Sequence, residues 1–87
     1  MKVLFNKQSE KDWNKIKQVK ALKNKAVILL AILEKNPYQN PPSYEKLSGE
    51  LQNYYSRRIN KQHRLVYSVD EKEQVVRVIG MWTHYEN

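Results

Sequence analysis

The strongest constraint on the fold is a cluster of three prolines within six residues, Pro37, Pro41 and Pro42. Proline has no backbone N–H and a fixed φ angle, so this cluster is incompatible with both a helix and a central strand. We therefore predict a loop here, which delivers Glu45 and Leu47 toward a sheet. The residues before the loop have helical spacing, whereas those after it alternate like strands.

The chain opens with Lys2 to Asn6, a short apolar run closed by polar residues, which we predict to be a strand. Ser9 can cap the N-terminus of a following helix, and Asp12 in its first turn would interact favourably with the helix dipole. Trp13 and Ile16 would face inward. A first helix after the opening strand is therefore expected.

A second helical stretch starts at Leu22 and ends at Lys35. Its apolar residues recur with the spacing of one helical face; they are Leu22, Ala26, Leu29, Leu30 and Leu33. Because Val27 and Ile28 are apolar too, we expect the sheet on one side and a second helix or subunit on the other. No glycine or proline separates the two stretches, so one bent helix and a hairpin both fit. We favour a hairpin that breaks near Val19 to Leu22.

Three antiparallel strands are predicted after the loop, at Tyr54 to Ile59, Arg64 to Val69 and Gln74 to Trp82. The whole chain then reads as α+β, with an N-terminal strand, two helices and a three-stranded meander, and with the helices on one sheet face. Gly80 indicates a bulge that switches the facing of the last strand. Alternation alone therefore does not place the side chain of His84.

The middle strand alternates cleanly, with Leu65 and Tyr67 on the face expected to meet the helices. For Ile59 to share that face, its simplest partner is Leu65. Arg58 would then lie on the open face, one cross-strand diagonal from Arg64. This parity predicts that the two guanidinium groups converge. It does not by itself predict a catalytic role, because exposed arginines often serve solubility alone.

Composition narrows the class of protein further. Sixteen Lys and Arg residues against nine Asp and Glu give a net charge of +7, which favours polyanionic partners. The absence of cysteine excludes disulfides and thiolate metal sites, and no His or carboxylate cluster has ligand spacing, so we expect neither metal nor cofactor. The longest apolar run, Ala26 to Leu33, is far shorter than the roughly 20 residues of a membrane span. We expect a cytoplasmic protein with no membrane association.

Residues 1–87 are expected to form a single domain, because a chain of this length is too short for two cores. Such a chain buries only roughly 60% of its unfolded surface. A homodimer or a bound partner would therefore help to stabilise its thin core.

Three segments carry a family resemblance. They are Ser56-Arg57-Arg58-Ile59-Asn60-Lys61-Gln62-His63-Arg64-Leu65-Val66-Tyr67, the upstream Glu45-Lys46-Leu47, and the terminal His84-Tyr85. Together they resemble the signature of the YoeB branch of the RelE superfamily (the Txe/YoeB family), which are toxins of bacterial type II toxin–antitoxin systems. The resemblance runs over the whole chain and implies a RelE-like microbial RNase fold.

The resemblance also implies the site and its chemistry. In the family, a metal-free reaction uses the ribose 2′-hydroxyl as nucleophile, so the protein supplies a base, an acid and positive charge. The catalytic residues implied are Glu45 as general base, Arg64 as phosphate stabiliser, His84 as general acid and Tyr85 as a supporting group. The residues implied to hold flanking phosphates are Arg58, His63 and Lys46.

The partners implied are messenger RNA on the ribosome and an acidic, YefM-like cognate antitoxin. The activity implied is that of an mRNA interferase that inhibits translation.

Two alternative functions stay open. A ParE-like toxin would bind DNA gyrase without nuclease activity, and it would have no need of Glu45, Arg64 and His84 together. A non-catalytic RNA-binding module would bind RNA without forming a product.

Overall fold

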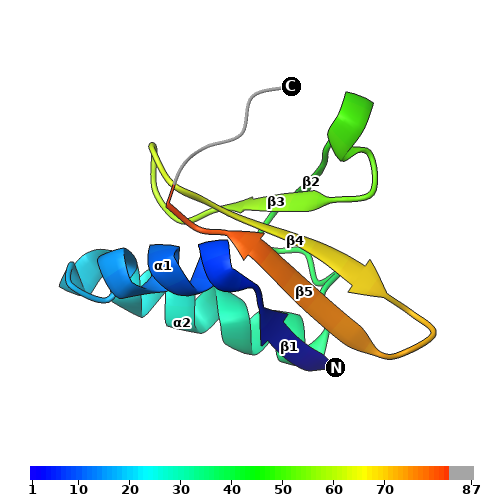
Figure 1. Ribbon diagram of the computed structural model, residues 1–87, viewed down its shortest axis with the longest axis horizontal. Coiled ribbons are helices and arrows are strands. Elements are labelled where there is room, and N and C mark those ends of the chain that lie inside the picture. The colour runs from blue at the N-terminus through cyan, green and yellow to red at the C-terminus, as the bar shows by residue number, and fades with distance from the viewer. Residues whose placement is uncertain (83–87) are drawn as a thin grey trace.

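The computed structural model describes residues 1–82, so the predicted catalytic residues His84 and Tyr85 lie outside the described part. The elements in chain order are β1 (Lys2–Phe5), α1 (Lys7–Ile16), α2 (Lys20–Lys35), β2 (Glu45–Lys46), the 3-10 turn η1 (Gly49–Leu51), β3 (Tyr55–Arg58), β4 (Arg64–Asp70) and β5 (Val75–Gly80). Figure 1 shows α1 and α2 side by side beneath one face of the sheet. This arrangement confirms the predicted α+β fold.

The sheet has five strands in the order β1-β5-β4-β3-β2. The predicted meander is confirmed, because β3, β4 and β5 pair as antiparallel neighbours. The opening strand β1 pairs in parallel with β5, which puts the first and the last strand of the described chain next to each other in the sheet. The short strand β2 extends the other edge by pairing with β3, in a segment that we expected to be a loop.

The two helices form a hairpin, as favoured from the sequence, but both begin earlier than expected. The N-cap of α1 is Asn6, so the prediction of Ser9 as the cap is wrong. The Asn6 side chain accepts a hydrogen bond from the Ser9 N–H at 2.8 Å, and the Ser9 hydroxyl accepts one from the Asn6 N–H at 2.9 Å. Ser9 instead completes this reciprocal capping box. Residues 17–19 separate the helices.

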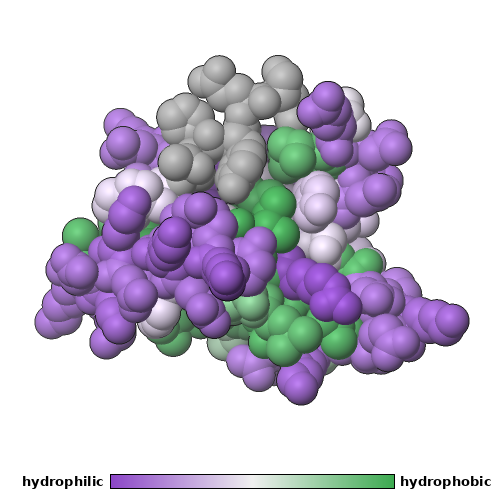
Figure 2. Space-filling view, viewed as in Figure 1, coloured by the Kyte–Doolittle hydropathy of each residue, from purple (hydrophilic) through white to green (hydrophobic). Residues whose placement is uncertain are grey.

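The core lies between the helices and the sheet. The buried apolar residues of this cluster are Ile16, Leu22, Ala26, Leu29, Leu33, Ile59, Leu65, Tyr67, Val76, Val78 and Met81, against which Trp13 packs. On the outer side of α2, Val27 and Ile28 remain 48% and 55% exposed. Within residues 1–82, only one side of α2 is therefore covered. Figure 2 shows that hydrophilic side chains cover the outer surface over α1.

A bulge at the end of β5 confirms the switch predicted at Gly80. Tyr67 pairs with Val78, whereas the preceding Val66 pairs with Gly80, which leaves Ile79 as the additional residue. The switch allows Met81 to enter the same core as Val78. Its backbone N–H is buried there and donates to Oδ2 of Asp12 at 2.9 Å. Asp12 thus anchors the end of β5 to α1, a contact that the sequence did not indicate.

Candidate functional site

Two of the three arginines of the signature, Arg58 and Arg64, meet on the open sheet face. Arg58 pairs directly with Arg64 across β3 and β4, and Arg57 pairs with Leu65. The predicted convergence is confirmed, but the predicted pairing of Ile59 with Leu65 is wrong by two residues. The turn explains the difference: Oδ1 of Asn60 accepts the backbone N–H groups of Gln62 at 2.8 Å and of His63 at 2.7 Å, and Ile59 N–H bonds to the His63 carbonyl.

Strand β2 brings a carboxylate to the same place. Glu45 pairs with Ser56 of β3, and its Oε2 lies 3.7 Å from Nη1 of Arg64. The same Nη1 donates to the Ser56 hydroxyl at 3.1 Å, which fixes the guanidinium between the two groups. The Glu45 side chain is 66% exposed and that of Arg64 21%. Exposed ion pairs add only ~0–1 kcal/mol to stability, so stability gives little reason for this arrangement.

These side chains surround a pocket of about 240 Å³. The residues that line it are Ser43, Tyr44, Glu45, Ser56, Arg58 and Arg64. One carboxylate therefore shares an open, polar pocket with two guanidinium groups. Such a pocket can receive a phosphodiester against the arginines while the carboxylate faces the neighbouring sugar.

Two of the expected phosphate-binding residues lie elsewhere. Lys46 is exposed on β2 but does not line this pocket. His63 is buried, and its ring stacks on Trp82 with 4.2 Å between ring centroids. The structure thus brings Glu45, Arg58 and Arg64 together and leaves Lys46 and His63 outside the pocket lining.

The sequence patterns did not indicate a role for Arg57, which the structure shows to be an important residue. Its side chain is 1% exposed on the helix-facing side of β3. Its guanidinium donates to three carbonyls of the proline loop, those of Pro37 at 2.9 Å, Gln39 at 2.9 Å and Pro42 at 2.6 Å. Its Nε donates to the Tyr67 hydroxyl at 3.1 Å. Arg57 therefore holds the loop that leads into Glu45, and the parity of Ile59, two residues later, was the signal that placed Arg57 inside.

Aromatic rings complete the support of this loop. The Arg57 guanidinium lies 4.9 Å from the ring centroid of Tyr44, the residue before Glu45. Tyr67 donates its hydroxyl to the Pro37 carbonyl at 3.0 Å. Burial raises the pKa of Tyr67, and the neighbouring Arg57 cation only partly opposes that rise. The loop is thus held by a neutral phenol and a buried cation, whose hydrogen bonds fix where Glu45 enters the sheet.

Two structural findings bear on cofactors and location. In residues 1–82, no three His, Asp or Glu side chains gather in a way that could hold a metal ion. Neither α1 nor α2 is long and apolar enough to cross a membrane. The pocket itself offers one carboxylate, two guanidinium groups and side-chain hydroxyls.

Comparison with known proteins gives a consistent result over the full length. Residues 5–85 match a family described as the YoeB-like toxin of bacterial type II toxin-antitoxin system. Toxin YoeB of Synechocystis sp. is 31% identical over 87 residues, which cover 99% of both chains. A solved YoeB/ParE toxin from Agrobacterium tumefaciens has a TM-score of 0.88 at 29% identity, over 98% of this chain and 100% of that one. The toxin in a YoeB-YefM complex from Staphylococcus aureus has a TM-score of 0.82 at 33% identity, over 98% of each chain.

Proposed function

Because the chain belongs to the family of YoeB-like toxins of bacterial type II toxin–antitoxin systems, we propose that it is an endoribonuclease that cleaves messenger RNA and thereby inhibits translation. The observation that carries the proposal is the single guanidinium of Arg64, held 3.7 Å from the Glu45 carboxylate and 3.1 Å from the Ser56 hydroxyl in a pocket shared with Arg58. Metal-free RNA cleavage needs a base, an acid and positive charge, and this pocket offers the base and the positive charge.

The reaction proceeds by attack of the ribose 2′-oxygen on the adjacent phosphorus. Glu45 accepts the 2′-hydroxyl proton, the new 2′-oxygen–phosphorus bond forms, and the bond from phosphorus to the 5′-oxygen breaks. Arg64 meets the oxygens that gain charge in the transition state, because its planar fork can contact two of them together. The products are a 2′,3′-cyclic phosphate and a 5′-hydroxyl. In this proposal residues 1–87 form the single domain that carries out the reaction.

The remaining roles follow from the family resemblance and from position. His84 protonates the departing 5′-oxygen, and Tyr85 supports the phosphate or stacks on a base. Arg58 holds a flanking phosphate from the same pocket, and the exposed Lys46 contributes charge at its edge. Burial of His63 against Trp82 suits a role in supporting the sheet end better than a phosphate contact.

The partners proposed are a ribosome-bound message and an acidic cognate antitoxin of the YefM kind. The net charge of +7 suits both of these partners. Structures of YoeB from Staphylococcus aureus have been solved both as a complex with YefM and as a YoeB dimer. The antitoxin would block the pocket by placing carboxylates against Arg58 and Arg64, and the exposed Val27 and Ile28 would suit a dimer contact.

The test is single-turnover cleavage of a ribosome-bound message by the wild type and by Glu45→Gln, which keeps the size of the side chain but cannot take a proton. We expect product with a cyclic or 3′-phosphate end from the wild type, loss of about 10²-fold or more in rate from the variant, and no product from a message with 2′-deoxyribose at the cleavage position. Inhibition of gyrase without any RNA cleavage would overturn the proposal in favour of a ParE-like activity.

A further inference from the structure

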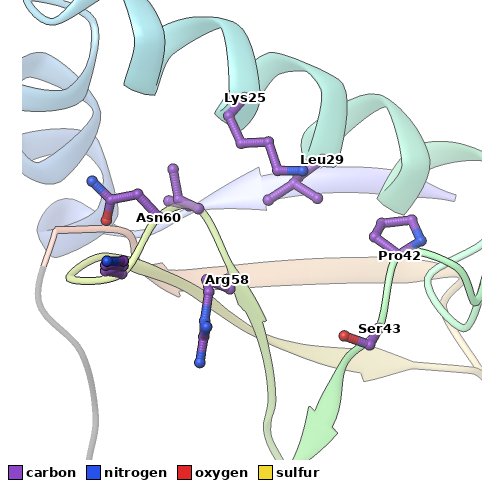
Figure 3. Close-up of a pocket in the computed structure, with 8 residues that line it drawn as sticks. Lys25, Leu29, Pro42, Ser43, Arg58 and Asn60 are labelled. Atoms are coloured by element: carbon purple, nitrogen blue, oxygen red, sulfur yellow. The ribbon is translucent and has the colours of Figure 1, made fainter.

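A second pocket adjoins the first on the side of helix α2. It has a volume of about 310 Å³ and is lined by Lys25, Leu29, Pro42, Ser43, Arg58, Ile59, Asn60 and Lys61. Figure 3 shows Lys25 and Leu29 on α2 at the top of the view, Arg58 and Asn60 below them at the end of β3 and in the turn that follows, and Pro42 and Ser43 on the right. Of the residues that line it, only Arg58 has a role in the proposed reaction, and Lys25, Leu29 and Pro42 lie outside the signature.

The lining has a marked division of chemistry. Leu29, Pro42 and Ile59 supply apolar surface, and the first and last of these belong to the core, so that part is rigid. Lys25, Arg58 and Lys61 supply three cations, and none of the eight lining residues is acidic. Leu29 and Ile59 are 1% and 5% exposed, so they form the floor of the pocket. An apolar floor bordered by cations suits a nucleotide, which combines an uncharged base with an anionic phosphate.

The two pockets are neighbours. Ser43 and Arg58 line both of them, so Arg58 stands between the Glu45 and Arg64 pocket and the second one. A strand of RNA whose scissile phosphate lies at Arg64 must continue into neighbouring space. Its next phosphate is only one ribose away, so the next nucleotide has to lie close by. The second pocket is the adjacent cavity with matching charge.

We propose that this second pocket is a subsite for the nucleotide next to the cleavage position, with its base against Leu29, Pro42 and Ile59 and its flanking phosphates at Lys25 and Lys61. This inference rests on the proposed RNA cleavage and deepens it. It assigns a part of α2 and of the β3–β4 turn to substrate binding. The base identity favoured there would follow from the fit of its edges in this pocket.

The test measures binding apart from cleavage, with a short RNA made uncleavable by a 2′-deoxyribose at the cleavage position and labelled for fluorescence anisotropy. The double variant Lys25→Ala/Lys61→Ala removes both lysines of the subsite. Its matched control, Lys23→Ala/Lys72→Ala, removes one exposed lysine from α2 and one from a turn, neither of which lines a pocket described above. Both double variants remove two positive charges.

We expect the subsite variant to lower the salt-dependence slope by about 1.4, because each phosphate contact with a single strand contributes roughly 0.7. The control should keep the wild-type slope. With the wild type, an abasic residue on one side of the cleavage position should weaken binding about fivefold, the loss expected when roughly 40 Å² of apolar surface is no longer buried. An abasic residue three positions away should leave binding unchanged.

Equal slopes for the two double variants would overturn the subsite, because they would show a general field only, and so would an absence of any abasic effect. Unchanged RNA binding with weaker binding of an acidic antitoxin peptide would overturn it in favour of a protein partner. These outcomes are distinguishable from failure of the proposed function, because RNA that binds as expected but is never cut on the ribosome would leave the subsite standing and refute the nuclease.

Discussion

Replacing Arg57 with lysine tests whether the buried guanidinium organises the site. The wild-type side chain donates to the carbonyls of Pro37, Gln39 and Pro42 and to the Tyr67 hydroxyl, and it is 1% exposed. A lysine ammonium keeps the charge, but it is a single point and cannot occupy all these positions. Arg57→Lys should therefore destabilise the fold and displace the loop before Glu45.

The magnitude follows from the carbonyls that lose their donor. Tyr67 continues to serve the Pro37 carbonyl, and the ammonium can serve one other, so one or two interactions are lost. Each buried group left unsatisfied costs about 1–3 kcal/mol, which gives about 1–6 kcal/mol in total. Since a domain of this size is stable by only about 4–13 kcal/mol, this is a substantial fraction. The melting temperature should fall by at least about 4 °C.

The assay is thermal and urea unfolding followed by circular dichroism, with Arg58→Lys as the matched control. Arg58 is the next residue along β3, but its side chain is exposed on the opposite face. The same substitution there should stay within about 0.5 kcal/mol of the wild type. If Arg57→Lys also stayed within that range, the role assigned to the buried guanidinium would be wrong.

Four further outcomes are expected. Arg64→Lys should lower single-turnover cleavage about 10²- to 10³-fold, nearly as far as Arg64→Ala, and a rate within about threefold of wild type would contradict a transition-state role. Asp12→Ala should lower the free energy of unfolding in urea by about 1–3 kcal/mol, because the buried Met81 N–H loses its acceptor. Because the pKa of Tyr67 is raised in the folded state, its stabilising effect should be full below about pH 10, the unfolded value, and be lost as the pH rises further, with a flatter profile for Tyr67→Phe. An acidic antitoxin at 100 times its Kd should add about 2.7 kcal/mol of stability and protect Arg58 and Arg64 from chemical modification, and unprotected arginines in the complex would refute occlusion of the pocket.

The parts of the fold that were predictable are those governed by short-range periodicity. Alternation in β4 correctly placed Leu65 and Tyr67 in the core and Arg64 on the open face. The bulge near Gly80 was also predicted, because the alternation changes there. The hairpin was favoured over one bent helix, although no glycine or proline marks the break between the two helices. The convergence of Arg58 and Arg64 followed from parity alone and did not depend on the register.

The features that were not predicted have a different physical cause. Each depends on a group distant in the sequence, or on which of several backbone groups a side chain bonds to. The register depends on Asn60 bonding to two N–H groups of the turn. Strand β2 is two residues long and exists only because β3 lies beside it. Arg57 is buried because carbonyls 15 to 20 residues earlier in the chain point at it. Periodicity indicates which face of a strand a side chain takes, but it carries no information on such contacts.

The adjacent arginines Arg57 and Arg58 do not by themselves define the register of β3, and neighbouring residues have to do so. A strand slipped by one residue exchanges its two faces. In β3 such a slip would still leave one arginine on each face, because Arg57 and Arg58 would simply trade places. The arginine pair therefore cannot specify the register on which the site depends.

The residues on either side of the pair break this degeneracy. In a slipped strand Ile59, now 5% exposed, would face solvent, and Ser56, which is 1% exposed and accepts the hydrogen bond from Arg64, would turn toward the core. Exposing the Ile59 side chain alone costs about 1.5–3 kcal/mol, a factor of roughly ten to a hundred in population. Because Glu45 pairs with Ser56, the same register that buries Ile59 also sets the distance between Glu45 and Arg64. Core packing at the end of β3 and the geometry of the proposed catalytic pair are thus fixed by one strand register.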